Sequence, residues 1–361
     1  MTIKLTRHTS NPLIKPMDIK PLFTDFKVDS VFNAGVVKYD DDILLLLRVA
    51  ESLKVKNGYD LSVPVIENNG KHHSLVIKTF NTKTDAEEYD FSDSRSISTK
   101  DENGNKKTKY LTSLSHLRIG RSKDGINFSI EDKAFIFPSQ KYETWGIEDP
   151  RITKIGNVFY INYTGVSQYG ACTVLAKTFD FKTYERLGVI FPPENKDVTI
   201  FPEKINGLYY AYHRPVPKSI GSPNIWTATS PDLINWGNHN HFMGTTDIGW
   251  ESGRIGGGAP SFKTEKGWIH IYHAADKNDR YCLGAFITEL DDPTKLIAKT
   301  KEPILEPEES YELKGFFDSV VFTCGLIIEG NKVKIYYGAA DKYIALAEID
   351  LQNLYKALEI D

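Results

Sequence analysis

Thr229-Ser230-Pro231-Asp232-Leu233-Ile234-Asn235-Trp236 is one of a set of related turns that recur from residue 110 onward. Most of these turns place an aspartate just after a Ser or Thr, and several carry an aromatic residue a few positions later. The turn aspartates are Asp124, Asp180, Asp232, Asp291 and Asp350, at intervals of about 52 to 59 residues, a period that suits four-stranded propeller blades. Five such marks predict an all-β fold, a five-bladed β-propeller that forms a single domain over residues 1–361.

Alternating strands between these turns support the propeller. They cover residues 157–163, 207–213, 267–273 and 331–337, and each begins after a turn residue. In a propeller the innermost strands converge on the axis, so we expect polar residues at the ends of these equivalent strands to become neighbours. An axial active-site pocket follows from this arrangement.

Two regions depart from the repeat. Residues 1–30 are mixed and interrupted by prolines, which is typical of an N-terminal arm that is held by packing on the main body. Residues from about 51 to 110 form a long, turn-rich insertion. Such an insertion is either a substrate-shaping loop or a tolerated surface excursion, and the residues do not choose between the two.

An apolar hairpin precedes the insertion. The runs Val31–Tyr39 and Ile43–Leu47 flank an acidic turn, and the second run predicts a strand that is buried on both faces. Arg48 then ends this strand of leucines. A guanidinium at that position needs a carboxylate, a phosphate or water within reach.

The composition excludes several classes of partner. The formal net charge is −4 without a long basic block, so neither nucleic acid nor a membrane is expected as a partner. Cys172, Cys282 and Cys324 are odd in number and lack CxxC spacing, so we interpret them as buried thiols and expect no metal site. The N-terminus lacks the apolar core of a signal peptide, and the longest aliphatic run, Ile43–Leu47, is too short to span a bilayer. A cytoplasmic location is expected.

Two acids and a base surround a proline in the run Trp145-Gly146-Ile147-Glu148-Asp149-Pro150-Arg151. Pro150 cannot donate to a strand ladder and biases Asp149 away from helical geometry. We therefore expect this run at a strand end or in a tight loop, with its carboxylates turned toward a cavity. A solvated surface turn is the alternative, since Asp-Pro is ordinary turn chemistry.

Basic side chains gather at other strand ends that would meet on the axis, namely Arg48, Lys196, His213, Arg214 and Arg254. Such a cluster must be neutralised by internal carboxylates or by a bound anion of the size of phosphate. Asp149, Asp341 and the rings of Tyr281 and Phe322 would supply a sugar site beside it. The glycine run 256–258 permits close backbone approach to a ligand, although a propeller crossing explains it as well.

These residues resemble glycoside hydrolase family 130, the β-mannoside phosphorylases and related mannosidases, and in particular its β-1,2-mannobiose and β-1,2-oligomannan phosphorylases. The family is built as a five-bladed propeller. The resemblance covers nearly the whole chain in order, through Asn11-Pro12, Phe32-Asn33, Gly146 to Arg151, Phe201 to Gly207, His213 to Pro215, Ser230 to Leu233, Ile255 to Gly258, Gly267-Trp268, Ile271 to His273 and Phe322 to Asp341.

The resemblance implies inverting phosphorolysis of a β-mannoside oligosaccharide, with inorganic phosphate as co-substrate and no cofactor. Asp149 would be the general acid, relaying a proton through a mannose hydroxyl to the glycosidic oxygen while phosphate attacks the anomeric carbon from the opposite face. The implied phosphate contacts are Lys196, Arg214, Arg254, Tyr281, His213 and His273. The implied contacts to the transferred mannose are Asn33, Arg48, Asp341, Phe322 and Arg151.

Two positions depart from the family pattern. Lys196-Asp197 stands where some relatives have Arg-Asn, and Arg254 stands where some have Lys. Both substitutions keep the basic charge, whereas Asp197 adds an acid to that loop.

Several alternatives stay open. An inverting β-1,2-mannosidase needs a second carboxylate to activate water, so one carboxylate with several cations favours phosphorolysis. A phosphorylase acting on β-1,4-mannosyl-glucose and a non-catalytic glycan-binding propeller are the other two. The class of enzyme also allows a homo-oligomer.

Overall fold

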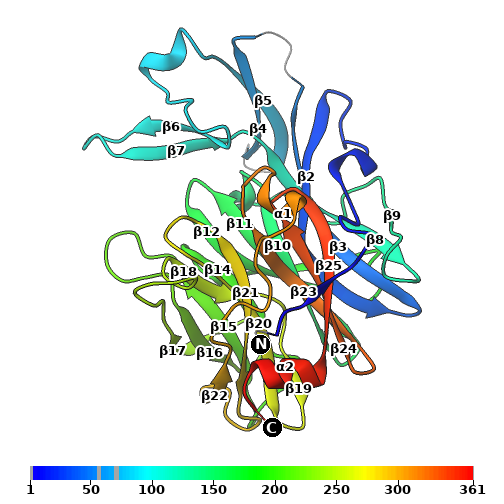
Figure 1. Ribbon diagram of the computed structural model, residues 1–361. Helices are drawn as coiled ribbons and strands as arrows, with labels where there is room; N and C mark the ends of the chain where they lie inside the picture. The colour runs from blue at the N-terminus through cyan, green and yellow to red at the C-terminus, as the bar shows by residue number, and fades with distance from the viewer. Residues whose placement is uncertain (1–2, 55–57, 69–72, 361) are drawn as a thin grey trace.

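The computed structural model describes residues 3–54, 58–68 and 73–360. The described chain folds into five antiparallel sheets around one axis, which confirms the predicted five-bladed β-propeller (Figure 1). We number the blades I to V along the chain. Two further two-stranded sheets, β4-β5 and β6-β7, stand apart from the blades.

The blades contain the following strands. Blade I has β2 (Phe26–Tyr39), β3 (Asp42–Leu53), β8 (Leu114–Ser122) and β9 (Ser129–Ile130). Blade II has β10 (Ile147–Ile155), β11 (Val158–Ser167), β12 (Gly170–Thr178) and β13 (Glu185–Phe191). Blade III has β14 (Asn195–Ile200), β15 (Tyr209–Pro215), β16 (Ile225–Ser230) and β17 (Gly237–Met243). Blade IV has β18 (Arg254–Gly257), β19 (Phe262–Thr264), β20 (Gly267–Ala275), β21 (Tyr281–Thr288) and β22 (Leu296–Lys299), with β18 and β19 both paired to β20. Blade V has β23 (Val321–Glu329), β24 (Lys332–Ala339), β25 (Tyr343–Asp350) and β1 (Thr6–Arg7).

The first strand of each blade lies nearest the axis, where β2 packs against both β10 and β23, and β14 against β10 and β18. The alternating strands assigned to that position from the sequence belong instead to β11, β15, β20 and β24, the second strand of each blade. The sequence prediction was therefore wrong by one strand. A second strand has paired neighbours on both sides and packs in the blade interior, so its apolar pattern is clearer than that of a strand facing a polar cavity.

The predicted turns connect the third and fourth strands of blades I to III. In each turn the aspartate accepts two backbone N–H groups, as Asp232 does from Ile234 and Asn235 at 2.9 and 2.8 Å. In blade IV the acceptor is Asp292, one residue after the predicted aspartate. In blade V, Asp350 ends β25 and precedes helix α2 (Leu351–Ala357), because the fourth strand of this blade comes from the other end of the chain.

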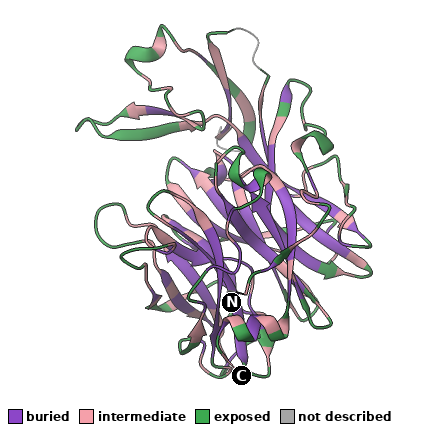
Figure 2. Ribbon diagram, viewed as in Figure 1, coloured by how far each residue is buried: buried purple, intermediate pink, exposed green. Residues whose placement is uncertain are grey.

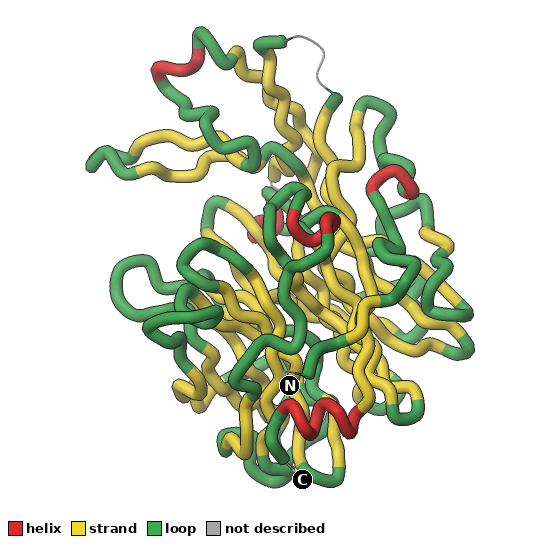
Figure 3. The backbone as a smooth tube through the Cα atoms, viewed as in Figure 1, coloured by secondary structure: helices red, strands yellow, loops and turns green. Residues whose placement is uncertain are grey.

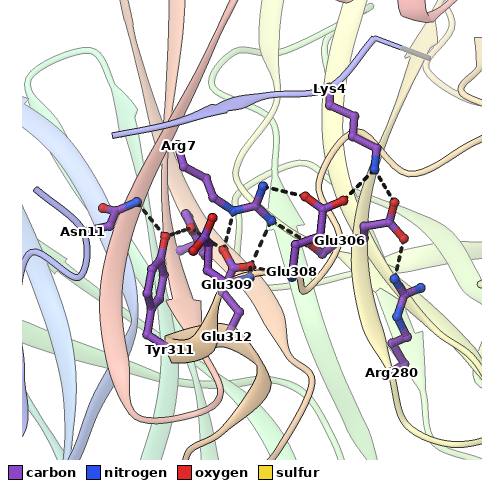
Figure 4. Close-up of polar contacts among 10 residues, drawn as sticks. Lys4, Arg7, Asn11, Arg280, Glu306, Glu308, Glu309, Tyr311 and Glu312 are labelled. Atoms are coloured by element: carbon purple, nitrogen blue, oxygen red, sulfur yellow. Dashed lines mark hydrogen bonds and ion pairs between the residues drawn. The ribbon is translucent and has the colours of Figure 1, made fainter. Parts of the chain in front are cut away.

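The N-terminal arm closes the ring, since β1 pairs with β25. Figure 4 shows the side chains that hold it: Arg7 donates from Nε and Nη2 to the two carboxylate oxygens of Glu312, at 2.8 and 2.9 Å. Glu312 belongs to helix α1 (Ser310–Leu313), is fully buried, and also accepts from the Tyr337 hydroxyl at 2.7 Å. The arm therefore packs on the main body as predicted, and it supplies part of blade V.

The insertion is more regular than its sequence indicates. It leaves blade I after Leu53, returns at Leu114, and forms two hairpins, β4 (Asp60–Asn68) with β5 (His73–Asn81) and β6 (Ser96–Lys100) with β7 (Lys106–Leu111). A small core of Val63, Val65, Phe80 and Ile97 joins the two hairpins. These strands show no clear apolar alternation in the sequence, because only the few residues of this small core need apolar side chains. In Figure 1 the insertion stands over one end of the propeller.

Buried residues fill the blades, and exposed residues concentrate in the insertion and the outer loops (Figure 2). The predicted double burial of the leucine strand is confirmed, since Leu44 to Leu47 have no exposed surface. Helices are few and short, including η1 (Pro16–Asp18), η2 (Asp85–Glu87) and η3 (Lys141–Glu143) (Figure 3). Within the described ranges, no helix has the length and apolar content needed to cross a membrane. The three cysteines are buried and unpaired, as predicted.

Candidate active site

A cavity of about 360 Å³ lies among the inner strands of the propeller. Every blade contributes to it, and so does the insertion. The side chains around it are Asn33, Arg48, Arg95, Asp149, Lys196, Asp197, Arg214, Arg254, His273, Asp279, Tyr281, Phe317, Val320, Phe322 and Asp341. The axial pocket predicted from the sequence is present, and most of the predicted site residues lie around it.

Asp149 enters the cavity from a bulge at the start of β10, where the pairing with β11 shifts register between Glu148 and Arg151. Pro150 has no N–H for the ladder, and Asp149 adopts a left-handed conformation with φ of 52°. Its carboxylate is nearly buried and accepts from Asn33 Nδ2 at 3.0 Å. The strand-end geometry predicted for this run is therefore correct, and the surface-turn alternative is excluded.

Arg48 is paired with two carboxylates, as expected for a guanidinium at the end of an apolar strand. Its guanidinium donates from Nη1 to Asp149 Oδ1 and from Nη2 to Glu148 Oε1, both at 2.9 Å, and it lies 4.3 Å from the centre of the Phe32 ring. Burial would raise the pKa of Glu148, but Arg48 and Lys196 lower it to about 2. Glu148 is therefore a fixed counter-ion at neutral pH.

The Lys and Arg side chains among the six predicted phosphate contacts each meet a carboxylate. Lys196 Nζ donates to Glu148 Oε2 at 3.0 Å, and Arg214 reaches Asp197 Oδ2 at 2.7 Å. Arg254 is paired with Asp279 and also donates to the Tyr281 hydroxyl at 2.9 Å. The expectation of one carboxylate among several cations is thus wrong. The basic cluster is therefore neutralised by internal carboxylates, which is one of the two ways expected from the sequence.

Asp197 is the most heavily paired of these acids. It accepts from Arg214, lies 3.2 Å from His273 Nε2, and lies 3.3 Å from Arg151 Nη2. Burial opposes its ionisation, yet Arg214 and His273 hold the pKa of this carboxyl well below its usual range. The departure at Asp197 from the family pattern therefore supplies the counter-ion that positions Arg214.

Asp341 follows β24, with φ of 50°, and it lines the cavity within reach of the charges of Arg48, Asp149 and Glu148. Burial raises its pKa to about 7, while Arg48 lowers it and the neighbouring charges of Asp149 and Glu148 raise it further. A pKa of about 7 lets this carboxyl change its protonation state near neutral pH.

Arg151 was predicted to contact mannose, but it lies behind the cavity wall. It is almost fully buried and donates to the carbonyl oxygens of Gly257 and Gly258, both at 2.7 Å. A β-carbon on Gly256 would come within 2.8 Å of both His273 and Asp197. The glycine run thus lets the backbone cross packed protein groups, which is the structural alternative for that motif.

His213 was predicted beside phosphate, but it lies outside the cavity. Its Nδ1 is 2.9 Å from Asn195 Nδ2, its Nε2 is 3.1 Å from His239 Nδ1, and it stacks on Phe191. Burial, and then His239, lower its pKa to about 3, so the ring is neutral. It supports the strand that carries Arg214.

Several lining residues were not predicted, namely Arg95, Asp279, Phe317 and Val320. Arg95 comes from the insertion, and the other three come from loops before β21 and β23. No periodic pattern marks these positions, so only the tertiary fold identifies them. In the described part of the chain, no three metal-ligating acid, histidine or cysteine side chains come together in a geometry that could hold a metal ion.

A buried carboxylate that shares an axial cavity of about 360 Å³ with three paired cations is the arrangement expected of a carbohydrate-active propeller. The chain belongs to glycoside hydrolase family 130, because the family model described as beta-1,4-mannooligosaccharide phosphorylase matches residues 106–360.

Among its relatives is a beta-1,2-mannobiose phosphorylase from Listeria innocua, 45% identical over 359 residues, which are 99% of each chain. A 1,2-beta-oligomannan phosphorylase from Thermoanaerobacter is 43% identical over 251 residues, which are 68% of this chain and 82% of that one. The solved complex of the Listeria innocua enzyme with beta-1,2-mannobiose superposes with a TM-score of 0.93 and covers 99% of this chain and 100% of that one.

Proposed function

We propose that the protein cleaves β-1,2-mannobiose with inorganic phosphate, with inversion, to give α-mannose 1-phosphate and mannose. The observation that carries the proposal is that Asp149 lines one cavity together with Lys196, Arg214 and Arg254. The full-length similarity to a β-1,2-mannobiose phosphorylase supports the choice of linkage and substrate length.

The cavity has two sides. Asn33, Arg48, Asp149 and Asp341 come from blades I, II and V, whereas the three cations come from blades III and IV. We assign the transferred mannose to the first side, with Phe322 against its apolar face, and phosphate to the second. Phosphate and the leaving sugar then lie on opposite sides of the anomeric carbon, as inversion requires.

In this assignment a phosphate oxygen forms the new bond to the anomeric carbon while the bond to the glycosidic oxygen breaks. Asp149 gives a proton to a mannose hydroxyl, which passes its own proton to the leaving oxygen. Lys196, Arg214 and Arg254 exchange part of their contact with carboxylates for contact with the phosphate anion. No cofactor takes part, and activity should survive dialysis against a chelator.

The test is product analysis with and without phosphate. Incubation with β-1,2-mannobiose and phosphate should release α-mannose 1-phosphate and mannose in equal amounts. The same incubation with β-1,4-mannosyl-glucose should be much slower, and equal rates would reject the linkage. Sugar release that is equally fast without phosphate would reject phosphorolysis.

A hydrolytic mannosidase is the second candidate, and Asp341 is the observation that favours it. This carboxyl, with its pKa near 7, could accept a proton from water as a second carboxylate. The pairing of Lys196, Arg214 and Arg254 around one side of the cavity weighs toward phosphate, because water needs no such cluster. The phosphate-free incubation decides between the two reactions.

A cytoplasmic location goes with this proposal. The three unpaired cysteines suit a reducing compartment, and the reaction consumes inorganic phosphate. Association into a homo-oligomer is also proposed from the class of enzyme, and light scattering of the purified chain tests it.

A further inference from the structure

Of the insertion residues that the structure describes, Arg95 is the one whose side chain lines the cavity. We propose that Arg95 and Phe317 hold the leaving sugar and close the cavity behind it, so that the pair limits the length of the acceptor. This inference rests on the proposed phosphorolysis and adds the residues that select the acceptor.

Arg95 is partly exposed, and Asp93 orients its guanidinium. Its Nε and Nη2 donate to the two oxygens of Asp93, both at 3.0 Å, and its carbonyl accepts from the backbone of Thr112 at 3.0 Å. Its guanidinium carbon lies 5.1 Å from the centre of the Phe317 ring. Nη1 takes no part in this bidentate pair, so it remains as a donor for a hydroxyl group in the plane of the guanidinium.

Phe317 is fixed on the mannose side of the cavity. Its backbone N–H donates to the carbonyl of Ala340 at 3.1 Å, directly before Asp341. Arg95 lies close enough for Asp341 and Asp279 to raise its pKa, after the larger effect of Asp93. Asp341 follows a strand of blade V, whereas Asp279 is the partner of Arg254 in blade IV. The pair therefore lies between the mannose side and the partly exposed Arg254–Asp279 pair, and there we place the leaving sugar.

The same two segments border a second cavity. Ser94 and Phe316, the neighbours of Arg95 and Phe317, line a cavity of about 600 Å³ between the insertion and blade I. The two segments thus form a partition between the cavities: Arg95 and Phe317 line the first, and Ser94 and Phe316 line the second. A planar cation against an aromatic ring suits one sugar, since the ring covers an apolar face and the guanidinium binds hydroxyl oxygens.

In the synthetic direction α-mannose 1-phosphate is the donor and mannose is the acceptor. The KM for each is measured separately, so an effect on acceptor binding is distinguished from an effect on donor binding. Arg95→Ala and Phe317→Leu should each raise the KM for mannose by about fivefold or more, as expected for loss of a charged hydrogen bond or a ring contact. The KM for α-mannose 1-phosphate should stay within about twofold of the wild-type value. Lys100→Ala is the matched control, an exposed cation on the same insertion that does not line the cavity.

The partition role is tested by substrate length. In Arg95→Ala the ratio of phosphorolysis rates on β-1,2-mannotriose and β-1,2-mannobiose should rise above the wild-type ratio, because the two cavities become continuous. An unchanged ratio would overturn the partition, and an equal rise in both KM values would overturn the acceptor contact. If wild-type cleavage does not need phosphate, the proposed function fails. If it does and both variants match Lys100→Ala, this inference alone fails.

Discussion

The two sides of the cavity are built from opposite arrangements of charge. On the side of blades I, II and V, the carboxylate of Asp149 is held by donors, Arg48 at 2.9 Å and Asn33 at 3.0 Å. On the side of blades III and IV, the cations are held by carboxylates: Arg214 by Asp197 of blade III, and Lys196 by Glu148, which reaches over from blade II. One side therefore presents an acid and the other presents cations that a stronger anion can recruit. The difference teaches that net charge alone does not identify an anion site. A paired cation can still bind an anion if it can exchange its carboxylate partner for that anion.

The largest effect is expected on the acid side. Asp149→Asn keeps the shape and the contact to Asn33 but removes the proton donor, so kcat should fall by about 10² to 10⁴-fold. Mannobiose binding measured by calorimetry should change by less than about threefold. A variant with near-wild-type turnover would contradict the role of Asp149, and a variant with no sugar binding would point to a structural one.

The next largest effect is expected on the cation side. Arg214→Ala removes one phosphate donor and leaves Asp197 with Arg151 and His273. The KM for phosphate should rise by about ten- to a hundredfold, the cost of a charged hydrogen bond, while the KM for mannobiose moves much less. Steady-state kinetics with each substrate varied will measure both. Equal changes in both constants would erase the distinction between the two sides.

A pH experiment sharpens the comparison through Asp341. Its folded pKa of about 7 lies above the ordinary value of 3.8, so its contribution to stability is greatest below about pH 4 and is lost as the pH rises to about 7. Asp341→Asn cannot titrate. The difference in unfolding free energy, wild type minus variant, should therefore fall by on the order of a few kcal/mol across this window. Thermal or urea unfolding at a series of pH values checks this, and parallel profiles would reject it.

The smallest effect is expected at the cavity mouth. Asp279→Asn removes the carboxylate that competes with phosphate for Arg254. Both side chains are partly exposed, so the pair is weak, and the KM for phosphate should fall by only about two- to fivefold. The neighbouring Asp276→Asn serves as the comparison, because Asp276 caps the same loop without contacting Arg254. A rise in this KM would mean that Asp279 positions Arg254 instead of competing for it.

The fold was predictable because it repeats. In four blades the predicted turn aspartate is the residue that caps the turn or lies one position before it. The fifth, Asp350, ends β25 in blade V, where the N-terminal strand β1 supplies the fourth strand and no such turn is needed. Lys196, Arg214 and Arg254 were also predictable as basic residues at strand ends that the propeller brings together. Lys196 and Arg254 lie at the start of the first strands of blades III and IV, and Arg214 lies at the end of the second strand of blade III opposite Lys196. The resemblance to family 130 assigned these residues their chemistry.

The remainder depends on tertiary contacts that have no sequence period. Arg95 lies far along the chain from Phe317, and the carboxylate partners Asp197 and Asp279 are recognised only once their cations are placed. His213 failed for a related reason, because successive side chains of a strand point to opposite faces and Arg214 took the cavity face. Side-chain direction, more than position along the chain, limited the prediction.

The two ends of the insertion lie next to each other, since Glu51 of β3 pairs with Leu114 of β8. A tight turn could join these strands directly and leave the ring intact. Natural variation or engineering can therefore exchange the module that carries Arg95 as a unit, and the repertoire of accepted sugars can diversify while the bond-breaking chemistry is inherited unchanged.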